Sequence, residues 1–233
     1  MIKLLGRSKS FKVRANWFHF WAKVFLWIIN GNVVVKGKVP THGIVACNHL
    51  SYADIIVLGS IFPLVIVSKS EVASWPVIGP LTQCAGTLFI RRASKADVVR
   101  IGNEMATVIN SGVPLALFLE GTTSTGETVL PFHSSLLAPV EKNGFPVFPA
   151  WMHYTVVDGT MEKDICYVGD DTFFPHSLKM MTKPSFEAYV GFGEPVTGMT
   201  DRKETARELH ARVCRIKDDY FAAKKEPAQF AAK

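Results

Sequence analysis

The chain is predicted to fold as one α/β domain, with a mostly parallel central sheet flanked by helices. Strand-like and helix-like segments alternate along the sequence, which is the pattern of α/β proteins. Several strand candidates are apolar at every position, as expected for strands covered on both faces of a parallel sheet. A chain of 233 residues can bury a sizeable core in one domain, and the sequence contains no repeat or linker that would divide it.

Short apolar runs bounded by turn residues predict the strands, which lie at residues 32–36, 43–47, 64–67, 87–91, 114–119, 145–152, 164–168 and 186–192. Apolar residues at helical spacing predict helices at 54–60, 96–111 and 134–141. Pro76 and Pro80 disfavour a long helix within residues 71–83. A final helix begins near Asp201, where Glu204 completes a capping box. Its predicted inner face is formed by Ala206, Leu209, Val213, Ile216 and Tyr220.

Residues 1–31 are predicted to be a basic, amphipathic segment that binds a membrane. The first 14 residues carry five basic side chains and no acidic one, namely Lys3, Arg7, Lys9, Lys12 and Arg14. Further on, one helical face carries polar side chains, and aromatic and aliphatic side chains cover the rest. That polar face consists of Lys12, Asn16, His19 and Lys23. The membrane-binding side chains are expected to be Trp17, Phe20, Trp21, Phe25 and Trp27.

Other roles for this segment fit less well. A spanning helix needs about 20 mainly apolar residues, and Lys23 and His19 interrupt the apolar stretch. No small-residue cleavage site follows, as it would in a signal peptide. A helix lying in the bilayer interface suits the pattern best, and each basic charge near anionic lipid would contribute about 1 kcal/mol. A helix packed on its own domain stays open as an alternative. Residues 32–224 then form the folded domain, and residues 225–233 a frayed tail.

The net charge of +6 and the isoelectric point near 9.1 favour an anionic partner, either nucleic acid or an anionic lipid surface. The basic residues cluster near the two ends of the chain, and no nucleic-acid-binding pattern is present, so nucleic acid is not expected. The four cysteines have no CxxC spacing, so we expect neither a disulfide framework nor a zinc site.

The segment NHLSYAD, residues 48–54, contains the pair that carries chemistry. His49 follows an apolar strand, and Asp54 lies five residues further on. Histidine changes charge near neutral pH, and an adjacent carboxylate fixes its tautomer. If the two side chains touch, they form a general base that can act on a hydroxyl or thiol.

Two further segments stand at the ends of predicted strands. GTLFIRR, residues 86–92, ends in Arg91 and Arg92, whose guanidinium groups could clamp an anion. FLEGTTS, residues 118–124, runs from a buried strand into a glutamate, a glycine and three hydroxyls. Glu120 could pair with one of the arginines or hold an acceptor hydroxyl, and Gly121 allows a ligand to approach the backbone closely. A surface arginine pair and an ordinary turn are the plainer interpretations.

Together, these blocks resemble the glycerolipid acyltransferases that include 1-acylglycerol-3-phosphate acyltransferase. That family carries the blocks N-H-x-x-x-x-D, G-x-x-F-I-x-R and F-x-E-G-T-R-S in this order. The matching residues here are Asn48, His49 and Asp54; Gly86, Phe89, Ile90 and Arg92; and Phe118, Glu120, Gly121, Thr122 and Ser124. Val147, Phe148 and Pro149 match a looser fourth block. The resemblance covers roughly residues 32–195.

The resemblance implies a membrane-associated O-acyltransferase of lipid biosynthesis, with residues 32–224 as its acyltransferase domain. It would move a fatty acyl group from an acyl thioester to the free hydroxyl of 1-acylglycerol-3-phosphate or a related lysolipid. The thioester, of acyl carrier protein or coenzyme A, is a co-substrate, and no bound cofactor or metal is expected. His49 and Asp54 are the implied catalytic residues. The implied substrate-binding residues are Asn48, Arg91, Arg92, Glu120, Gly121, Thr122 and Thr123. The protein would lie at the cytoplasmic face of the membrane as a peripheral or monotopic protein.

The chain departs from the family pattern at Thr123, where the third block usually has an arginine. In the family, that arginine is linked to binding the acceptor's phosphate. Either Arg92 compensates, or the acceptor lacks a terminal phosphate. The flanking sequence resembles the subset that acylates lyso-ornithine lipid.

Two other classes of protein stay open. A serine hydrolase would need a serine placed against His49, and the sequence has no GxSxG elbow. A non-catalytic lipid-binding protein would account for the N-terminal segment but leaves the NHLSYAD and FLEGTTS blocks without a role.

Overall fold

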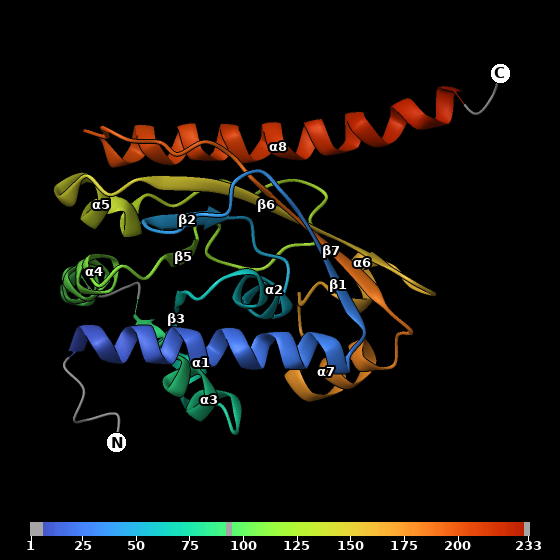
Figure 1. Ribbon diagram of the computed structural model, residues 1–233, viewed down its shortest axis with the longest axis horizontal. Helices are drawn as coiled ribbons and strands as arrows, with labels where there is room; N and C mark the ends of the chain where they lie inside the picture. The colour runs from blue at the N-terminus through green and yellow to red at the C-terminus, as the bar shows by residue number, and fades with distance from the viewer. Residues whose placement is uncertain (1–6, 92–94, 231–233) are drawn as a thin grey trace.

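The structure, a computed structural model, describes residues 7–91 and 95–230. It contains one seven-stranded sheet in the order β1-β7-β6-β2-β5-β3-β4, with helices on both faces (Figure 1). Neighbouring strands are parallel except for the antiparallel pair β6–β7. The prediction of a single α/β domain with a mostly parallel sheet is therefore confirmed. The strands are β1 (Gly31–Lys36), β2 (Ile44–Cys47), β3 (Val65–Lys69), β4 (Leu88–Ile90), β5 (Leu115–Phe118), β6 (Val147–Val156) and β7 (Phe186–Phe192).

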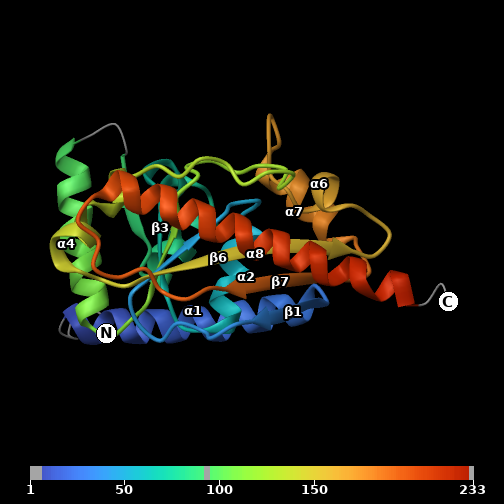
Figure 2. The same ribbon diagram turned by 90° about the horizontal axis from the view of Figure 1, so that it is seen from above.

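Two layers of helices enclose the sheet. The α-helices are α1 (Arg7–Ile28), α2 (Ala53–Ile61), α3 (Ile78–Ala85), α4 (Lys95–Asn110), α5 (Ala138–Asn143), α6 (Met161–Asp164), α7 (Phe173–Met181) and α8 (Arg202–Phe230), with 3₁₀ turns η2 (Ser70–Ser74) and η3 (Ser135–Leu137). One buried cluster joins α1, α2 and α7 to the sheet, and another joins α4, α5 and the start of α8 to its other face. Figure 2 shows α8 crossing over β6, and Figure 1 shows α8 on the side opposite α1.

The two short central strands, β2 and β5, place the motifs. Both read as continuous apolar runs, and every residue in them is buried because helices cover both faces of the sheet. In register, Cys47 lies opposite Phe118 and Ala150. The carboxyl ends of parallel strands meet at one edge of a sheet, which is where α/β proteins bind ligands. The segments that follow β2 and β5 therefore lie next to each other.

Helix α1 packs on its own domain through one face. Ala22 and Leu26 are buried there, and the ring of Phe18 lies so close to α2 that a Cβ on Gly59 would stand 2.4 Å from it. His19, predicted to lie on the polar outer stripe, instead faces inward, and its Nδ1 donates to the Gly59 carbonyl at 2.7 Å. Phe25, predicted to contact membrane, packs against the core because it lies on the same face as these residues.

The opposite face of α1 is open and exposes Trp17, Phe20, Trp21 and Trp27. One face of α1 is thus packed on its own domain, as the alternative interpretation predicts. The other face exposes aromatic side chains, as the amphipathic pattern predicts. Among the described residues, no helix is both long enough and apolar enough to cross a membrane.

The structure differs from the predicted elements at 164–168, at helix α7 and at the end of helix α8. The strand predicted at 164–168 is wrong, because α6 ends at Asp164 and irregular chain follows. The α6 turn is stabilised by the Thr160 hydroxyl, which caps it, and by the Asp164 carboxylate, which accepts from the Thr160 N–H at 2.8 Å. Helix α7 was not predicted, since Pro175 discourages a helix, although proline is tolerated in a first turn. Helix α8 continues beyond Lys224, where fraying is predicted, to Phe230.

Candidate active site

The predicted contact between His49 and Asp54 is present. His49 is the second residue after β2, and Asp54 lies in the first turn of α2. The His49 Nδ1 lies 2.8 Å from Asp54 Oδ2; the carboxylate is fully buried, whereas the imidazole is 19% exposed. Because an ionised carboxylate only accepts hydrogen bonds, Nδ1 carries the proton and Nε2 keeps a free lone pair. A partly exposed imidazole held in this tautomer can take a proton from a bound molecule.

The Asp54 carboxylate has four hydrogen-bond donors. Besides His49, Oδ2 accepts from the backbone N–H groups of Leu50 at 2.7 Å and Ser51 at 2.9 Å. The hydroxyl of Tyr154, on β6, donates to Oδ1 at 2.7 Å. A buried charge is tolerated only when it is paired and hydrogen-bonded, and this set of donors meets that condition. Asp54 is therefore fixed on its backbone loop, and through it so is the plane of the His49 ring.

The FLEGTTS segment holds the main chain of His49. Glu120 Oε2 accepts from the His49 N–H at 3.0 Å, and the Ser124 N–H donates to the His49 carbonyl at 2.9 Å. The Phe118 ring stacks on the imidazole, with ring centroids 4.0 Å apart. His49 is thus held at its backbone and on one ring face by the block that follows β5.

Glu120 supports the loop, whereas the sequence suggested contact with an arginine or a substrate hydroxyl. Its other oxygen, Oε1, accepts from the Leu130 N–H at 3.0 Å, so both carboxylate oxygens bind backbone groups. Burial raises the pKa of Glu120 to about 7, although the two N–H groups oppose this shift. Asn48, also predicted to bind substrate, is buried as well: its amide donates to the Met152 carbonyl at 3.1 Å and accepts from the Met152 N–H at 2.8 Å. It ties the end of β2 to β6.

The structure does not bring Arg91 to the site. Strand β4, which precedes Arg91, is the edge strand, and β3 and β5 separate it from β2. The Arg91 Nε lies 3.1 Å from Asp97 Oδ2 on α4. The predicted anion clamp at Arg91 is thus engaged in a surface ion pair, and Arg92 lies outside the described residues.

Thr123, at the family's arginine position, holds a neighbouring loop. Its hydroxyl donates to the backbone carbonyl of Tyr167, and the Tyr167 N–H donates to the Leu50 carbonyl at 2.9 Å. Gly121 has a φ of +78°, in the left-handed region that favours glycine, and Thr122 is exposed on the same turn. The turn therefore connects the His49 segment with the segment before α7.

Aromatic side chains line the far side of the His49 segment. His176 Nε2 donates to the Cys166 carbonyl at 3.0 Å, which leaves Nδ1 of the neutral ring as an acceptor. The Tyr52 hydroxyl therefore donates to His176 Nδ1, at 2.9 Å. The Tyr52 ring also contacts Tyr167 and Phe173, with centroids 5.6 and 4.8 Å away. The contacts that Tyr52 and Tyr154 make are not predicted by the sequence, since their partners are 100 or more residues away and no spacing rule links them.

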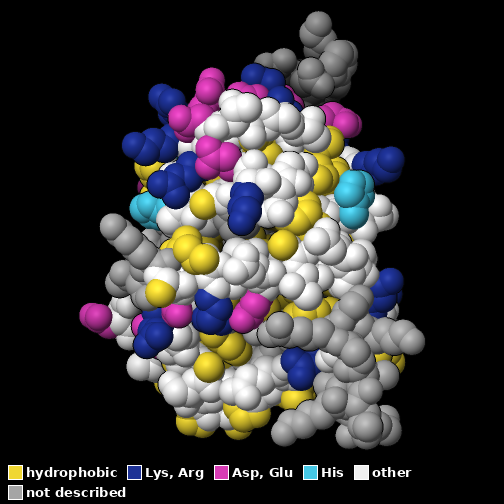
Figure 3. Space-filling view, turned by 90° about the vertical axis from the view of Figure 1, so that its left-hand side faces the viewer, with side chains coloured by type: hydrophobic (Ala, Val, Ile, Leu, Met, Phe, Trp, Pro, Cys, Tyr) yellow, Lys and Arg dark blue, Asp and Glu magenta, His cyan; other side chains and the backbone are white. Residues whose placement is uncertain are grey.

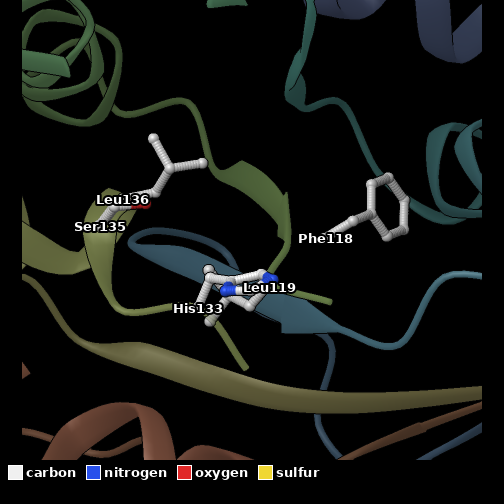
Figure 4. A pocket seen from close by; sticks show the side chains of 5 residues that line it. All are labelled: Phe118, Leu119, His133, Ser135 and Leu136. Atoms are coloured by element: carbon white, nitrogen blue, oxygen red, sulfur yellow. The ribbon is translucent and has the colours of Figure 1, made fainter. Parts of the chain in front are cut away.

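A cavity of 230 Å³ opens next to the base. It is lined by Phe118, Leu119, His133, Ser135 and Leu136 (Figure 4). Phe118 lies on one side of it and Leu136 on the other, with His133 between them. Phe118 also stacks on His49, so one side chain belongs both to the cavity wall and to the surroundings of the base, while His49 itself does not line the cavity.

The arrangement favours a base that acts on an external molecule. Ser51, the nearest serine in sequence, is completely buried, and the Ser124 hydroxyl donates to the backbone carbonyl of His49 at 3.5 Å. In the described part of the chain, no serine or cysteine side chain hydrogen-bonds to the His49 imidazole. The serine-hydrolase alternative therefore lacks its nucleophile. The fold and the site define an α/β enzyme in which a buried carboxylate orients a histidine base at the carboxyl edge of the sheet.

Comparisons with known proteins show the family to which the chain belongs. The Acyltransferase family model matches residues 32–153. The lyso-ornithine lipid O-acyltransferases of Pseudomonas aeruginosa and Brucella abortus are each 35% identical, over 78% and 71% of this chain and 70% and 67% of theirs. A 1-acyl-sn-glycerol-3-phosphate acyltransferase of Neisseria gonorrhoeae is 34% identical over 49% of this chain and 45% of its own. The chain belongs to the acyltransferase family and is an enzyme of acyl transfer.

A solved structure agrees with the fold. The 1-acyl-sn-glycerophosphate acyltransferase of Thermotoga maritima superposes with a TM-score of 0.66, at 22% sequence identity. The match covers 93% of this chain and 84% of the other, so it includes the helices on both faces of the sheet. The resemblance stated from the sequence blocks is confirmed.

The Tyr154 hydroxyl is predicted to improve catalysis without touching substrate. Tyr154→Phe keeps the ring and removes one donor from Asp54, which retains three. A net hydrogen bond contributes about 0.5–1.5 kcal/mol, so we expect kcat to fall about three- to tenfold. Steady-state kinetics should show this with the KM of both substrates unchanged. A rise in KM with unchanged kcat would instead place Tyr154 in substrate binding.

Proposed function

We propose that this protein is a lyso-ornithine lipid O-acyltransferase. It would move a fatty acyl group from an acyl thioester to the free hydroxyl of an ornithine lipid that lacks one acyl chain. The single observation that carries this choice of acceptor is Thr123, which occupies the phosphate-linked arginine position and whose hydroxyl bonds to Tyr167. The relatives that match over most of this chain and bear the lyso-ornithine name support it further.

The His49–Asp54 pair supports direct transfer. His49 Nε2 takes the proton from the acceptor hydroxyl while that oxygen attacks the thioester carbonyl carbon. The new C–O bond forms, the C–S bond breaks, and the proton passes from His49 to the departing thiolate, which leaves as a thiol. Asp54, fixed by its four donors, stabilises the imidazolium that exists between these steps. No covalent acyl-enzyme is needed.

Among the described residues, the two candidate phosphate-binding positions, Arg91 and Thr123, favour an acceptor without phosphate. Thr123 supplies no positive charge, and Arg91 is paired with Asp97 at the edge strand. A phosphate monoester is usually bound by bidentate, charge-assisted hydrogen bonds, which these two residues do not offer. An ornithine head group carries a carboxylate and an ammonium group, so its net charge is close to zero.

The donor in this proposal is an acyl thioester of acyl carrier protein or coenzyme A. The protein would act at the cytoplasmic face of the membrane, and the open face of α1 supports binding to a membrane. It exposes three tryptophans beside Lys12 and Lys23, and no acidic residue occurs anywhere in the helix. Such a surface is typical of helices that lie in the interface of an anionic bilayer.

The acceptor is tested with purified full-length protein, one labelled acyl thioester and two acceptors, lyso-ornithine lipid and 1-acylglycerol-3-phosphate. We expect kcat/KM to be at least about tenfold higher for lyso-ornithine lipid, because one unmade charge-assisted hydrogen bond is worth about 1.5–3 kcal/mol. Products are identified by mass.

An acceptor analogue that lacks the hydroxyl provides the control and should give no product. A clear preference for 1-acylglycerol-3-phosphate would contradict the choice of acceptor and leave acyl transfer in place. Hydrolysis of the thioester with neither acceptor acylated would contradict the proposed reaction as well.

A further inference from the structure

Helix α7 has an apolar stripe that no part of the described chain covers. Phe174, Leu178 and Met181 are spaced four and three residues apart, so they lie on one face of the helix. They are 57%, 63% and 47% exposed. The opposite face is buried through His176 and Met180. The helix therefore has its packing face satisfied, and a second apolar face is turned to the outside.

The stripe continues onto the turn before α3. The ring of Trp75 lies 5.8 Å from that of Phe173, which in turn lies 5.6 Å from Phe174. Val77, two residues beyond Trp75, is 62% exposed and has a φ of +65°. A β-branched residue in this region is strained, and such strain concentrates at functional sites. The rim patch is defined as Trp75, Val77, Phe173, Phe174, Leu178 and Met181.

The rim patch begins at the wall of the active site. The Phe173 ring contacts Tyr52 at 4.8 Å, and Tyr52 lies between His49 and Asp54 in the chain. The loop held by Thr123 contributes Tyr167, whose ring also contacts Tyr52, with centroids 5.6 Å apart. An acyl chain lying on the patch would thus reach Tyr52, three residues from His49 in the chain.

The patch also lies on the same side of the sheet as α1. Figure 1 shows α1, α3 and α7 on the side opposite α8. Arg14 of α1 donates to the Gln83 carbonyl of α3. Trp75, three residues before α3 begins, contacts Phe173 of α7. By contrast, the end of the molecule near α4 and α5 shows charges of both signs between scattered apolar side chains (Figure 3), as ordinary protein surfaces do.

We propose that the rim patch inserts into the bilayer interface beside the active site, as a second membrane contact in addition to α1. The lipid acceptor then passes from the bilayer to His49 along the rim patch, without its acyl chain crossing water. This inference rests on the proposed function, because a lipid substrate requires such a path. A membrane is favoured over a protein partner because the patch adjoins the lipid site and shares its side with the basic, aromatic face of α1.

The test is sedimentation of full-length protein with vesicles of phosphatidylethanolamine and phosphatidylglycerol. In the double variant Phe174→Asp/Leu178→Asp, two exposed side chains become charged, so the fold should be retained. Because two apolar side chains would no longer be buried in the bilayer interface, we expect the vesicle partition coefficient to fall at least about tenfold. The matched control is Val99→Asp, on α4, which is also exposed and lies away from the patch. It should bind vesicles as the native protein does.

Acyl transfer to a monomeric, short-chain acceptor separates the two proposals. The double variant should keep this activity and lose activity only on acceptor within vesicles. Unchanged vesicle binding by the double variant would overturn the rim patch as a membrane contact, whatever its activity. If light scattering shows that the native protein is a dimer and the variant a monomer with unchanged vesicle binding, the patch joins two copies instead. Absence of transfer by the native protein to any acceptor would contradict the proposed function and leave the binding result standing.

Discussion

His49→Ala is expected to lower kcat for acyl transfer by about 10²–10⁴-fold, the usual contribution of a positioned general base. Alanine removes Nε2, the atom that takes the hydroxyl proton. The backbone N–H and carbonyl of residue 49, which bond to Glu120 and Ser124, remain in place. Because the loop keeps these anchors, the KM values for both substrates should change little. The loss should therefore appear in kcat, as expected for an interaction made only in the transition state.

The matched control for this variant is His42→Ala. His42 is exposed and precedes β2, at the opposite end of that strand from His49. Its removal should leave kcat within about threefold of the native value, since a surface side chain away from the reacting atoms contributes little. Rates from labelled acyl thioester, with circular dichroism to confirm the fold, check both variants. Near-native kcat in His49→Ala would show that another group removes the proton.

Asp54→Asn should lower kcat by about 10²–10⁴-fold while the site keeps its shape. The amide is isosteric, and its oxygen can still accept from the Leu50 and Ser51 N–H groups. Its NH₂ group can donate to the Tyr154 hydroxyl, which then acts as acceptor. What is lost is the negative charge that stabilises the imidazolium and selects the tautomer with a free Nε2. Asp54→Ala is less informative, because a void surrounded by unpaired donors would also destabilise the fold.

Asp164→Asn provides the comparison for loss of a buried carboxylate. Asp164 is also buried and pairs with Lys183 at 3.1 Å, but it lies in α6 and does not contact His49. Thermal unfolding should show destabilisation of this variant, whereas its kcat should stay close to native. If both asparagine variants lose kcat to the same extent, the effect of Asp54 is a consequence of lower stability.

The elements of the sheet could be predicted because each strand is a short, continuous apolar run. Residues 44–47 and 115–118 are examples in which the local pattern alone specifies a buried strand. The strand expected at 164–168 fails because Asp164 and Thr160 close a short helical turn, and side-chain hydrogen bonds of this kind are not visible in hydropathy. The sequence does not predict which aromatic side chains of α1 are buried. Phe25 and Trp27 are both large and apolar, and only the position of α2 determines that Phe25 packs inward and Trp27 is exposed.

In the site, too, contacts between residues close in sequence could be predicted, whereas contacts between distant residues could not. His49 and Asp54 could be paired because a strand end and a helix start lie five residues apart. The role of Glu120 depends on β5 lying beside β2, and the role of Thr123 depends on the loop before α7. Neither the strand order nor the position of that loop can be predicted from the local sequence. Arg91 was expected at the site because its block accompanies the other two in the family, yet its strand lies at the sheet's edge. The blocks therefore predicted the chemistry better than they predicted the contacts.

A double-mutant cycle tests most directly whether His49 and Asp54 act as one catalytic unit. The kcat for transfer to lyso-ornithine lipid is measured for the native protein, His49→Ala, Asp54→Asn and the double variant. Asp54 acts here only through the imidazole, so the double variant should be as slow as His49→Ala, within about twofold. Losses that multiply in the double variant would contradict the dyad and show that the two residues contribute independently.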